Sequence, residues 1–213
     1  MNLNRTPFNK KGKIKALIFD IGNVVLFFDN HKVARNIAQI TDLTELTILK
    51  TVFDLYTQLE IDLGKVPIKE YFELIKEKLN LELTTKELRN IFDDIFTENH
   101  LMSSFIRRLE NRIPLAAITN TNRSHYEYII NRFGILSSFK RIFASCNLGI
   151  KKPSPGIYHH AVSYLGLRAQ ECLFIDDQER NLMPASAMGF HVHRYRQFEL
   201  FLTQCHHMGI PCV

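Results

Sequence analysis

The 213-residue sequence has no apolar run long enough to cross a bilayer and no apolar signal-peptide core near its start. A spanning helix needs about 20 predominantly apolar residues, and a secretory signal needs an apolar stretch behind a basic start. We therefore expect a cytoplasmic protein without a membrane partner. The four cysteines form no CxxC pair, which disfavours a structural zinc site and indicates buried free thiols.

Acidic residues are absent from the first 15 positions, which carry five of the lysine and arginine residues. The formal net charge of +5 therefore belongs to a basic tail, assigned to residues 1–13, and the rest of the chain is close to neutral. No recognised nucleic-acid-binding module follows this tail. We expect it to be solvated, and we expect no nucleic-acid partner.

The rest of the chain alternates short apolar runs, rich in β-branched residues, with helical patterns. This alternation predicts an α/β fold, in which a parallel sheet is covered by helices. Strands are expected at 14–19, 115–118, 141–145, 173–175 and 190–193. Helices are expected at 123–133, 155–165, 179–188 and 198–205.

Residues 30–100 interrupt this alternation with helical periodicity and no strand signal. Apolar residues three to four apart mark helical stripes within 43–55, 71–79 and 88–95, which we assign to packing. Thr84 with Glu87 has the form of a capping box and predicts a helix start. The expected organisation is a core of residues 14–29 and 101–213 with an inserted helical cap of residues 30–100.

Polar side chains stand where three of the predicted strands end. Asp20 follows the first strand, Thr119 and Asn120 the second, and Asp176 and Asp177 the fourth. Because parallel strands place their carboxyl ends at one edge of the sheet, these groups are expected to converge in a ligand-binding crevice. Adjacent carboxylates repel each other unless a cation lies near them.

Oxygen ligands without nearby cysteine or histidine suit a hard cation such as Mg²⁺, which also binds phosphate. Lys152 adds a positive charge just before Pro153 and Pro155, at the expected start of a helix, where phosphate binding is favoured. Lys151 is the neighbouring alternative. The residues therefore indicate phosphoryl chemistry.

With these residues in place, the sequence resembles the haloacid dehalogenase superfamily. Four motifs occur in the family's order: Leu17 to Val24 around Asp20, Ile118-Thr119-Asn120, Lys152-Pro153, and Phe174 to Asp177 with Asn181 following. Longer stretches around the last three motifs are similar to bacterial phosphatases that hydrolyse α-D-glucose 1-phosphate. The resemblance implies a Rossmann-like core with a helical cap inserted after the first motif.

The resemblance also implies a role for each motif residue. Asp20 would be the nucleophile, and Mg²⁺ would be held by Asp20, the backbone carbonyl of Gly22 and Asp177. Asp176 would act through a metal-bound water or by orienting Lys152.

Phosphate oxygens would be held by Thr119, the backbone of Asn120 and Lys152, which would also neutralise charge on the nucleophile. Asn181 would support the acidic pair from outside the metal's coordination sphere. The implied enzyme is a phosphoric monoester hydrolase that acts on a small phosphate ester, such as a sugar phosphate.

Gly22 departs from the pattern of most phosphatases of this superfamily, which carry a general acid at that position. General acid–base help contributes about 10²–10⁴-fold, so its loss should slow turnover of poor leaving groups without preventing attack. A metal-bound or cap-held water, Asp29 or His31 is a candidate source of the proton.

Two other functions remain open at this stage. One is a catalytically silent binding or regulatory protein, because a fold alone does not establish activity. The other is a 2-haloacid dehalogenase, whose family members work without magnesium. The intact pair Asp176-Asp177 disfavours the dehalogenase.

Overall fold

A computed structural model describes residues 13–211, and its centre is a five-stranded sheet in the order β5-β4-β1-β6-β7. All neighbouring strands in this sheet run parallel. The chain places β4 and β5 on one side of β1 and then returns to place β6 and β7 on the other, so the strand order reverses at β1. The predicted α/β class is confirmed. The strands are β1 (Ala16–Phe19), β4 (Leu115–Thr119), β5 (Arg141–Ala144), β6 (Cys172–Asp176) and β7 (His191–Arg194).

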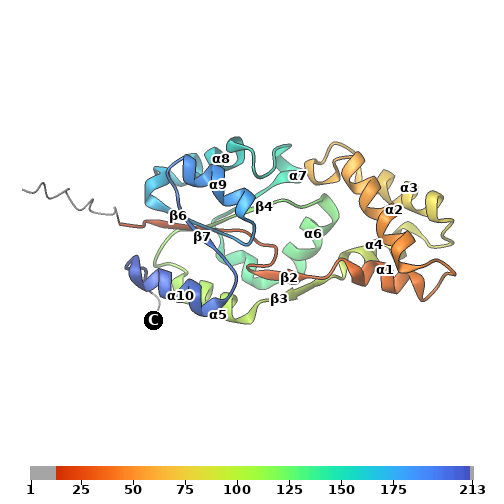
Figure 1. The fold of residues 1–213 in the computed structure, drawn as a ribbon, viewed down its shortest axis with the longest axis horizontal. Coiled ribbons are helices and arrows are strands. Elements are labelled where there is room, and N and C mark those ends of the chain that lie inside the picture. Colours follow the sequence, from red (N-terminus) through yellow and green to blue (C-terminus); the bar gives the residue numbers. More distant parts are fainter. Residues whose placement is uncertain (1–12, 212–213) are drawn as a thin grey trace, which may run out of the picture.

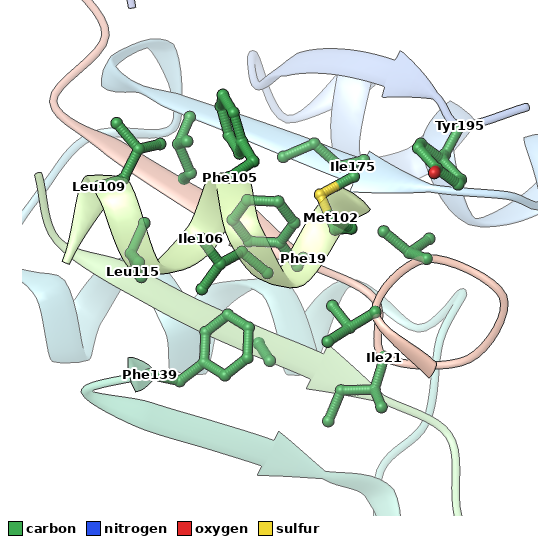
Figure 2. Close-up of a cluster of buried hydrophobic side chains, with 14 of the residues drawn as sticks. Phe19, Ile21, Met102, Phe105, Ile106, Leu109, Leu115, Phe139, Ile175 and Tyr195 are labelled. Atoms are coloured by element: carbon green, nitrogen blue, oxygen red, sulfur yellow. The ribbon is translucent and has the colours of Figure 1, made fainter. Parts of the chain in front are cut away.

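Helices cover both faces of the sheet, so the central strands are apolar on both sides. Phe19 of β1 points to the face where α5 and α10 pack, and Figure 2 shows it beside Phe105 and Ile106 of α5. Ile18 points to the opposite face, which α8 and α9 cover (Figure 1). The helices are α5 (His100–Leu109), α6 (Arg123–Arg132), α7 (Ser145–Leu148), α8 (Pro155–Leu165), α9 (Glu179–Ala187) and α10 (Phe198–His207), with short 3-10 turns η2 (Gly134–Ser138) and η3 (Ala169–Glu171).

The segment between β1 and β4 carries further helices at one end of the molecule (Figure 1). Their apolar side chains form a separate cluster whose buried members all lie between Val33 and Ile95. No helix within residues 13–211 is long and apolar enough to cross a membrane. These elements are α1 (His31–Ala38), α2 (Glu45–Gln58), η1 (Ile61–Leu63), α3 (Ile68–Leu79) and α4 (Thr85–Asp93).

A two-stranded antiparallel ribbon joins this helical segment to the sheet. It pairs β2 (Leu26–Phe28) with β3 (Phe96–Glu98). The expectation that residues 30–100 contain no strand is therefore wrong at β3. Strands of three residues are too short to show the two-residue alternation on which a strand prediction depends.

The helical stripes are confirmed in two of the three places. Tyr71 and Ile75 in α3, and Leu88 and Phe92 in α4, are buried. In α2 the expected stripe is wrong in part: Leu55 is buried as expected, but Leu46 is 76% exposed, and Ile48 and Val52 are buried in its place. The helix carries more apolar residues than one face can bury. The basic tail lies outside the described residues except for Lys13.

The predicted capping box at α4 is present. The Thr84 hydroxyl accepts the Glu87 backbone N–H at 3.2 Å, and Glu87 Oε2 accepts the Thr84 N–H at 2.8 Å. Thr84→Ala should lower the free energy of unfolding by about 1 kcal/mol, measured by urea denaturation. Thr57→Ala, near the end of α2, is the control and should leave the free energy of unfolding unchanged. Equal free energies of unfolding for the two variants would contradict the capping role of Thr84.

Candidate active site

Three carboxylates gather at the carboxyl ends of β1 and β6. Oxygen atoms of Asp20, Asp176 and Asp177 all lie within 4.8 Å of one another. Asp20 Oδ1 accepts the backbone N–H of Ile21 at 2.7 Å. This contact fixes one oxygen of a carboxylate that is only 5% exposed.

Lys152 is the cation that reaches these carboxylates. Its Nζ lies 2.8 Å from Asp20 Oδ2 and 2.7 Å from Asp176 Oδ2. The Asn120 side chain makes two hydrogen bonds with the backbone of Lys152. Its Nδ2 donates to the Lys152 carbonyl at 2.9 Å, and its Oδ1 accepts the Lys152 N–H at 2.8 Å. Lys151 instead pairs with Asp62 at 3.0 Å.

Asp176 and Asp177 differ in the hydrogen bonds that their carboxylate oxygens accept. Asp176 is fully buried, and its oxygens accept from the Gln178 N–H at 2.8 Å, Asn181 Nδ2 at 3.0 Å and Lys152. Asp177 Oδ2 accepts from Asn23 Nδ2 at 3.2 Å, whereas its buried Oδ1 has no hydrogen-bond partner within the described chain.

Burial makes the negative charge of this cluster costly. It raises the pKa of the Asp20 carboxyl to about 7; Lys152 opposes this shift, and Asp176 and Asp177 add to it. Burial also raises the pKa of Asp177. For Lys152, burial acts to lower the pKa, but the charges of Asp20 and Asp176 outweigh it and the pKa is raised.

Lys152 pairs with two of the three carboxylates, so the cluster keeps an excess of negative charge. The unpartnered Asp177 Oδ1 is an oxygen donor of the kind that a hard cation takes. The residues present thus fit a divalent cation beside Asp177 and Asp20. They do not leave an oxygen of Asp176 free for direct contact with one.

The remaining predicted site residues lie beside this cluster. Thr119, at the end of β4, lines the same cavity as Gly22 and Asn120, with a volume of about 220 Å³. Asn181 does not line that cavity; it is buried behind Asp176 and donates to both of its oxygens. The fold brings all of the predicted motif residues to one edge of the sheet.

Asp29 and His31, the suggested proton sources, do not line the cavity, and neither do Asp20 and Lys152, so the hydrogen bonds of Asp29 are the more informative observation. The Asp29 carboxylate accepts the His31 N–H at 2.9 Å and pairs with Arg35 at 2.5 Å. Both of its oxygens are therefore engaged away from the carboxylate cluster. The geometry gives no support to Asp29 as the proton donor.

Two features of the site escaped the sequence analysis. Asn23 orients Asp177 from a left-handed backbone conformation with φ of 56°, and its position within the first motif was the available signal. Aliphatic side chains of the helical segment, among them Leu49 and Val52, line the cavity. Their apolar periodicity was assigned to packing, because a cavity wall and a packed seam have the same pattern.

The site combines an aspartate after the central strand with a buried lysine and an acid pair on the adjacent strand. This combination is typical of one class of hydrolases. Residues 14–189 match the model of the haloacid dehalogenase-like hydrolases, and the chain belongs to this family. The predicted superfamily membership, and with it the prediction of an enzyme, is confirmed.

Among curated proteins, the chain is similar to the D-ribitol-5-phosphate phosphatase of Bacteroides thetaiotaomicron. The two are 24% identical over 188 residues, 83% of this chain and 89% of the relative. The chain is also similar to a sesquiterpene phosphatase of Aspergillus oryzae. These two are 26% identical over 187 residues, which cover 82% of this chain and 86% of the relative.

Among solved structures, a family enzyme of B. thetaiotaomicron in complex with magnesium and inorganic phosphate has a TM-score of 0.74. It is 21% identical and covers 86% of this chain and 94% of its own. This likeness supports the Rossmann-like fold.

Proposed function

We propose that the protein is a Mg²⁺-dependent phosphatase that hydrolyses a small phosphate monoester through an aspartyl-phosphate on Asp20. The observation that carries this proposal is the pairing of the buried Asp20 with Lys152 beside the open oxygen of Asp177. The phosphatase names of both curated relatives support it. Residues 30–100 would form the cap over this site, and a cytoplasmic location remains a prediction.

In the first step, an Asp20 carboxylate oxygen attacks phosphorus and the bond from phosphorus to the alcohol oxygen breaks. The alcohol oxygen leaves as an alkoxide and takes a proton from water; the hydroxide that remains is neutralised by the proton that the attacking water loses in the second step. In the second step, water attacks the phosphorus of the aspartyl-phosphate, which releases inorganic phosphate and regenerates the carboxylate. Positioning and charge neutralisation dominate such reactions, because both reactants are anionic.

The chain's own residues supply part of that neutralisation. Lys152 holds its ammonium group against Asp20, where charge on the transferred group develops. Asp176 orients the lysine, and Asn181 orients Asp176. The Thr119 hydroxyl and the backbone N–H of Asn120 would hold phosphate oxygens.

Mg²⁺ would be held by Asp20, the Gly22 carbonyl and Asp177, with Asp176 acting through water or through Lys152. When bound, it supplies the positive charge that lets a carboxylate approach a phosphate dianion. The cavity beside this site and the cap would determine which alcohol is accepted. The relatives do not decide this, because a ribitol ester and a sesquiterpenyl ester differ greatly in polarity.

Asp177→Asn should raise the Mg²⁺ concentration needed for half-maximal phosphate release by about 10–100-fold, because it removes charge from the open oxygen donor. Magnesium titration of the native protein and the variant measures this change. A chelator should abolish release by the native protein, and added Mg²⁺ should restore it. Full activity in excess chelator would contradict a metal-dependent mechanism.

A catalytically silent binding protein is the second candidate, favoured by the missing carboxylate at Gly22. A Cβ on Gly22 would lie 3.0 Å from Phe28 Cε1, so the ring takes up the space beside it. Phosphate release from an aryl phosphate and a panel of sugar phosphates, with Mg²⁺, separates the two functions. Release that requires Asp20 supports the phosphatase; no release from any ester supports the silent protein.

A further inference from the structure

The cavity at the proposed site extends from the sheet edge into the helical segment, and most of its wall is apolar. Its polar end contains Gly22, Thr119 and Asn120, which lie beside the carboxylate cluster. The opposite end contains no aspartate, glutamate, lysine or arginine among the described lining residues. The apolar wall includes Phe28, whose ring lies beside Gly22, and Leu49, Val52, Phe53, Tyr56 and Phe96.

Two of the polar residues in this wall already bond to the protein. The His125 ring contacts the Phe92 carbonyl through Nε2 at 3.0 Å, and burial lowers the pKa of His125 to about 4, so the ring is neutral. The Thr121 N–H donates to Ser145 Oγ at 2.9 Å.

The Asn120 amide also has both of its polar atoms engaged, with the backbone of Lys152. Asn30, at the start of α1, makes no side-chain capping bond, and with the Tyr56 hydroxyl it is among the few polar groups of the wall left for a ligand. A polyol has several hydroxyl groups, each of which must keep a partner when water is excluded. Most side chains of this wall are apolar and cannot supply such partners.

The size of the cavity limits the ligand as well. Its volume of about 220 Å³ includes the polar end at Thr119 and Asn120, and an apolar protein cavity that holds one benzene ring has a volume of about 150 Å³. One substituted ring, or a branched hydrocarbon of similar size, therefore fits. Phe28 and Phe96, whose ring centroids are 6.3 Å apart, form part of the wall that such a group would touch.

We infer that the alcohol portion of the substrate is uncharged and apolar, a single ring or a compact hydrocarbon rather than a polyol or a charged group. This inference rests on the proposed phosphatase function and names the substrate class of the same site. The phosphate would lie at Thr119 and Asn120, and the apolar group would lie against Leu49, Val52 and Phe53.

The test compares cyclohexylmethyl phosphate with glucose 6-phosphate. Both are esters of primary alcohols on six-membered rings, and they differ mainly in the ring oxygen and hydroxyl groups. We expect kcat/KM for cyclohexylmethyl phosphate to be higher by about tenfold or more, as is typical when a pocket offers no partners to polar groups. Equal or faster hydrolysis of glucose 6-phosphate would overturn the inference and leave the proposed phosphatase function intact.

Paired variants of α2 locate the effect in the cavity wall. Leu49→Gln places an amide in the wall, and it should lower kcat/KM for cyclohexylmethyl phosphate by about tenfold while changing that for glucose 6-phosphate much less. Leu46→Gln makes the same change at an exposed site three residues away and should alter neither. Equal effects of Leu49→Gln on both esters would contradict the assignment of this wall to the apolar group.

Binding of the non-hydrolysable cyclohexylmethylphosphonate separates the two proposals if the native protein releases no phosphate. Calorimetry with Mg²⁺ should show binding with a negative heat-capacity change, the mark of buried apolar surface. It should be about tenfold tighter than binding of methylphosphonate, which lacks the ring. Binding without turnover would reject the phosphatase and retain the apolar pocket; equal affinity for the two phosphonates would reject the pocket.

Discussion

Replacing Asp20 with asparagine should reduce phosphate release by about 10⁴-fold or more, because the amide oxygen cannot form the aspartyl-phosphate. The substitution preserves the shape of the side chain and removes its charge. The variant's Oδ1 still has the Ile21 N–H as a donor. We therefore expect the fold to be retained, with an unchanged circular dichroism spectrum, and the loss to appear in kcat.

Asp94→Asn is the matched control for this variant. Asp94 is an exposed acid on the helical segment, paired with Lys32 at 2.7 Å, and it does not line the cavity, although Ile95 and Phe96 beside it do. Its replacement should leave phosphate release within about twofold of the native rate, since exposed ion pairs contribute little. Substantial release by Asp20→Asn, measured against this control, would show that another group attacks phosphorus.

Lys152→Met should have the second-largest effect, and it should act on both activity and stability. The lysine side chain is 1% exposed and contacts two carboxylates. Removing one partner of a buried ion pair typically costs about 3–5 kcal/mol, because the other charge is left uncompensated. We expect a loss of that size in urea denaturation, and a decrease in phosphate release of about 10²–10³-fold in the folded fraction.

Lys151→Met provides the control, because it removes the same charge one residue earlier. The Lys151 side chain is 39% exposed and pairs with Asp62 outside the carboxylate cluster. Its loss should cost less than about 1 kcal/mol. If the two variants were equally stable and equally active, the assignment of Lys152 as the buried cation of the site would be wrong.

The sheet was predictable because its signals are local. The five predicted strands coincide with β1, β4, β5, β6 and β7 to within two residues at each end, since buried parallel strands carry continuous apolar, β-branched runs. The helix predicted at 155–165 matches α8 at both ends, where Pro155 stands at the first turn and Gly166 follows in a left-handed conformation.

The site residues were predictable for a topological reason. Asp20, Thr119 and Asp176 are far apart in sequence, but the parallel arrangement brings the ends of their strands to one edge. The roles assigned to them stay predictions, whereas their proximity is a structural observation.

Features formed only by tertiary contact could not be predicted in this way. Asn99 is buried and donates to the Val24 carbonyl at 2.8 Å and the Tyr195 hydroxyl at 2.9 Å, joining three segments that no local pattern connects. The ribbon of β2 and β3 depends on a pairing between residues about 70 positions apart. The cavity wall has the same origin, since it forms where the helical segment meets the sheet edge.

The measurement that tests the central claim most directly is the exchange of oxygen between ¹⁸O-labelled inorganic phosphate and ordinary water. Reversal of the second step lets Asp20 attack labelled phosphate and expel labelled water, and hydrolysis then returns unlabelled oxygen to phosphate. This assay requires no choice of ester. We predict loss of label with the native protein and Mg²⁺, and retention with Asp20→Asn or with a chelator. Retention of label by the native protein, or equal loss with Asp20→Asn, would contradict an aspartyl-phosphate at Asp20.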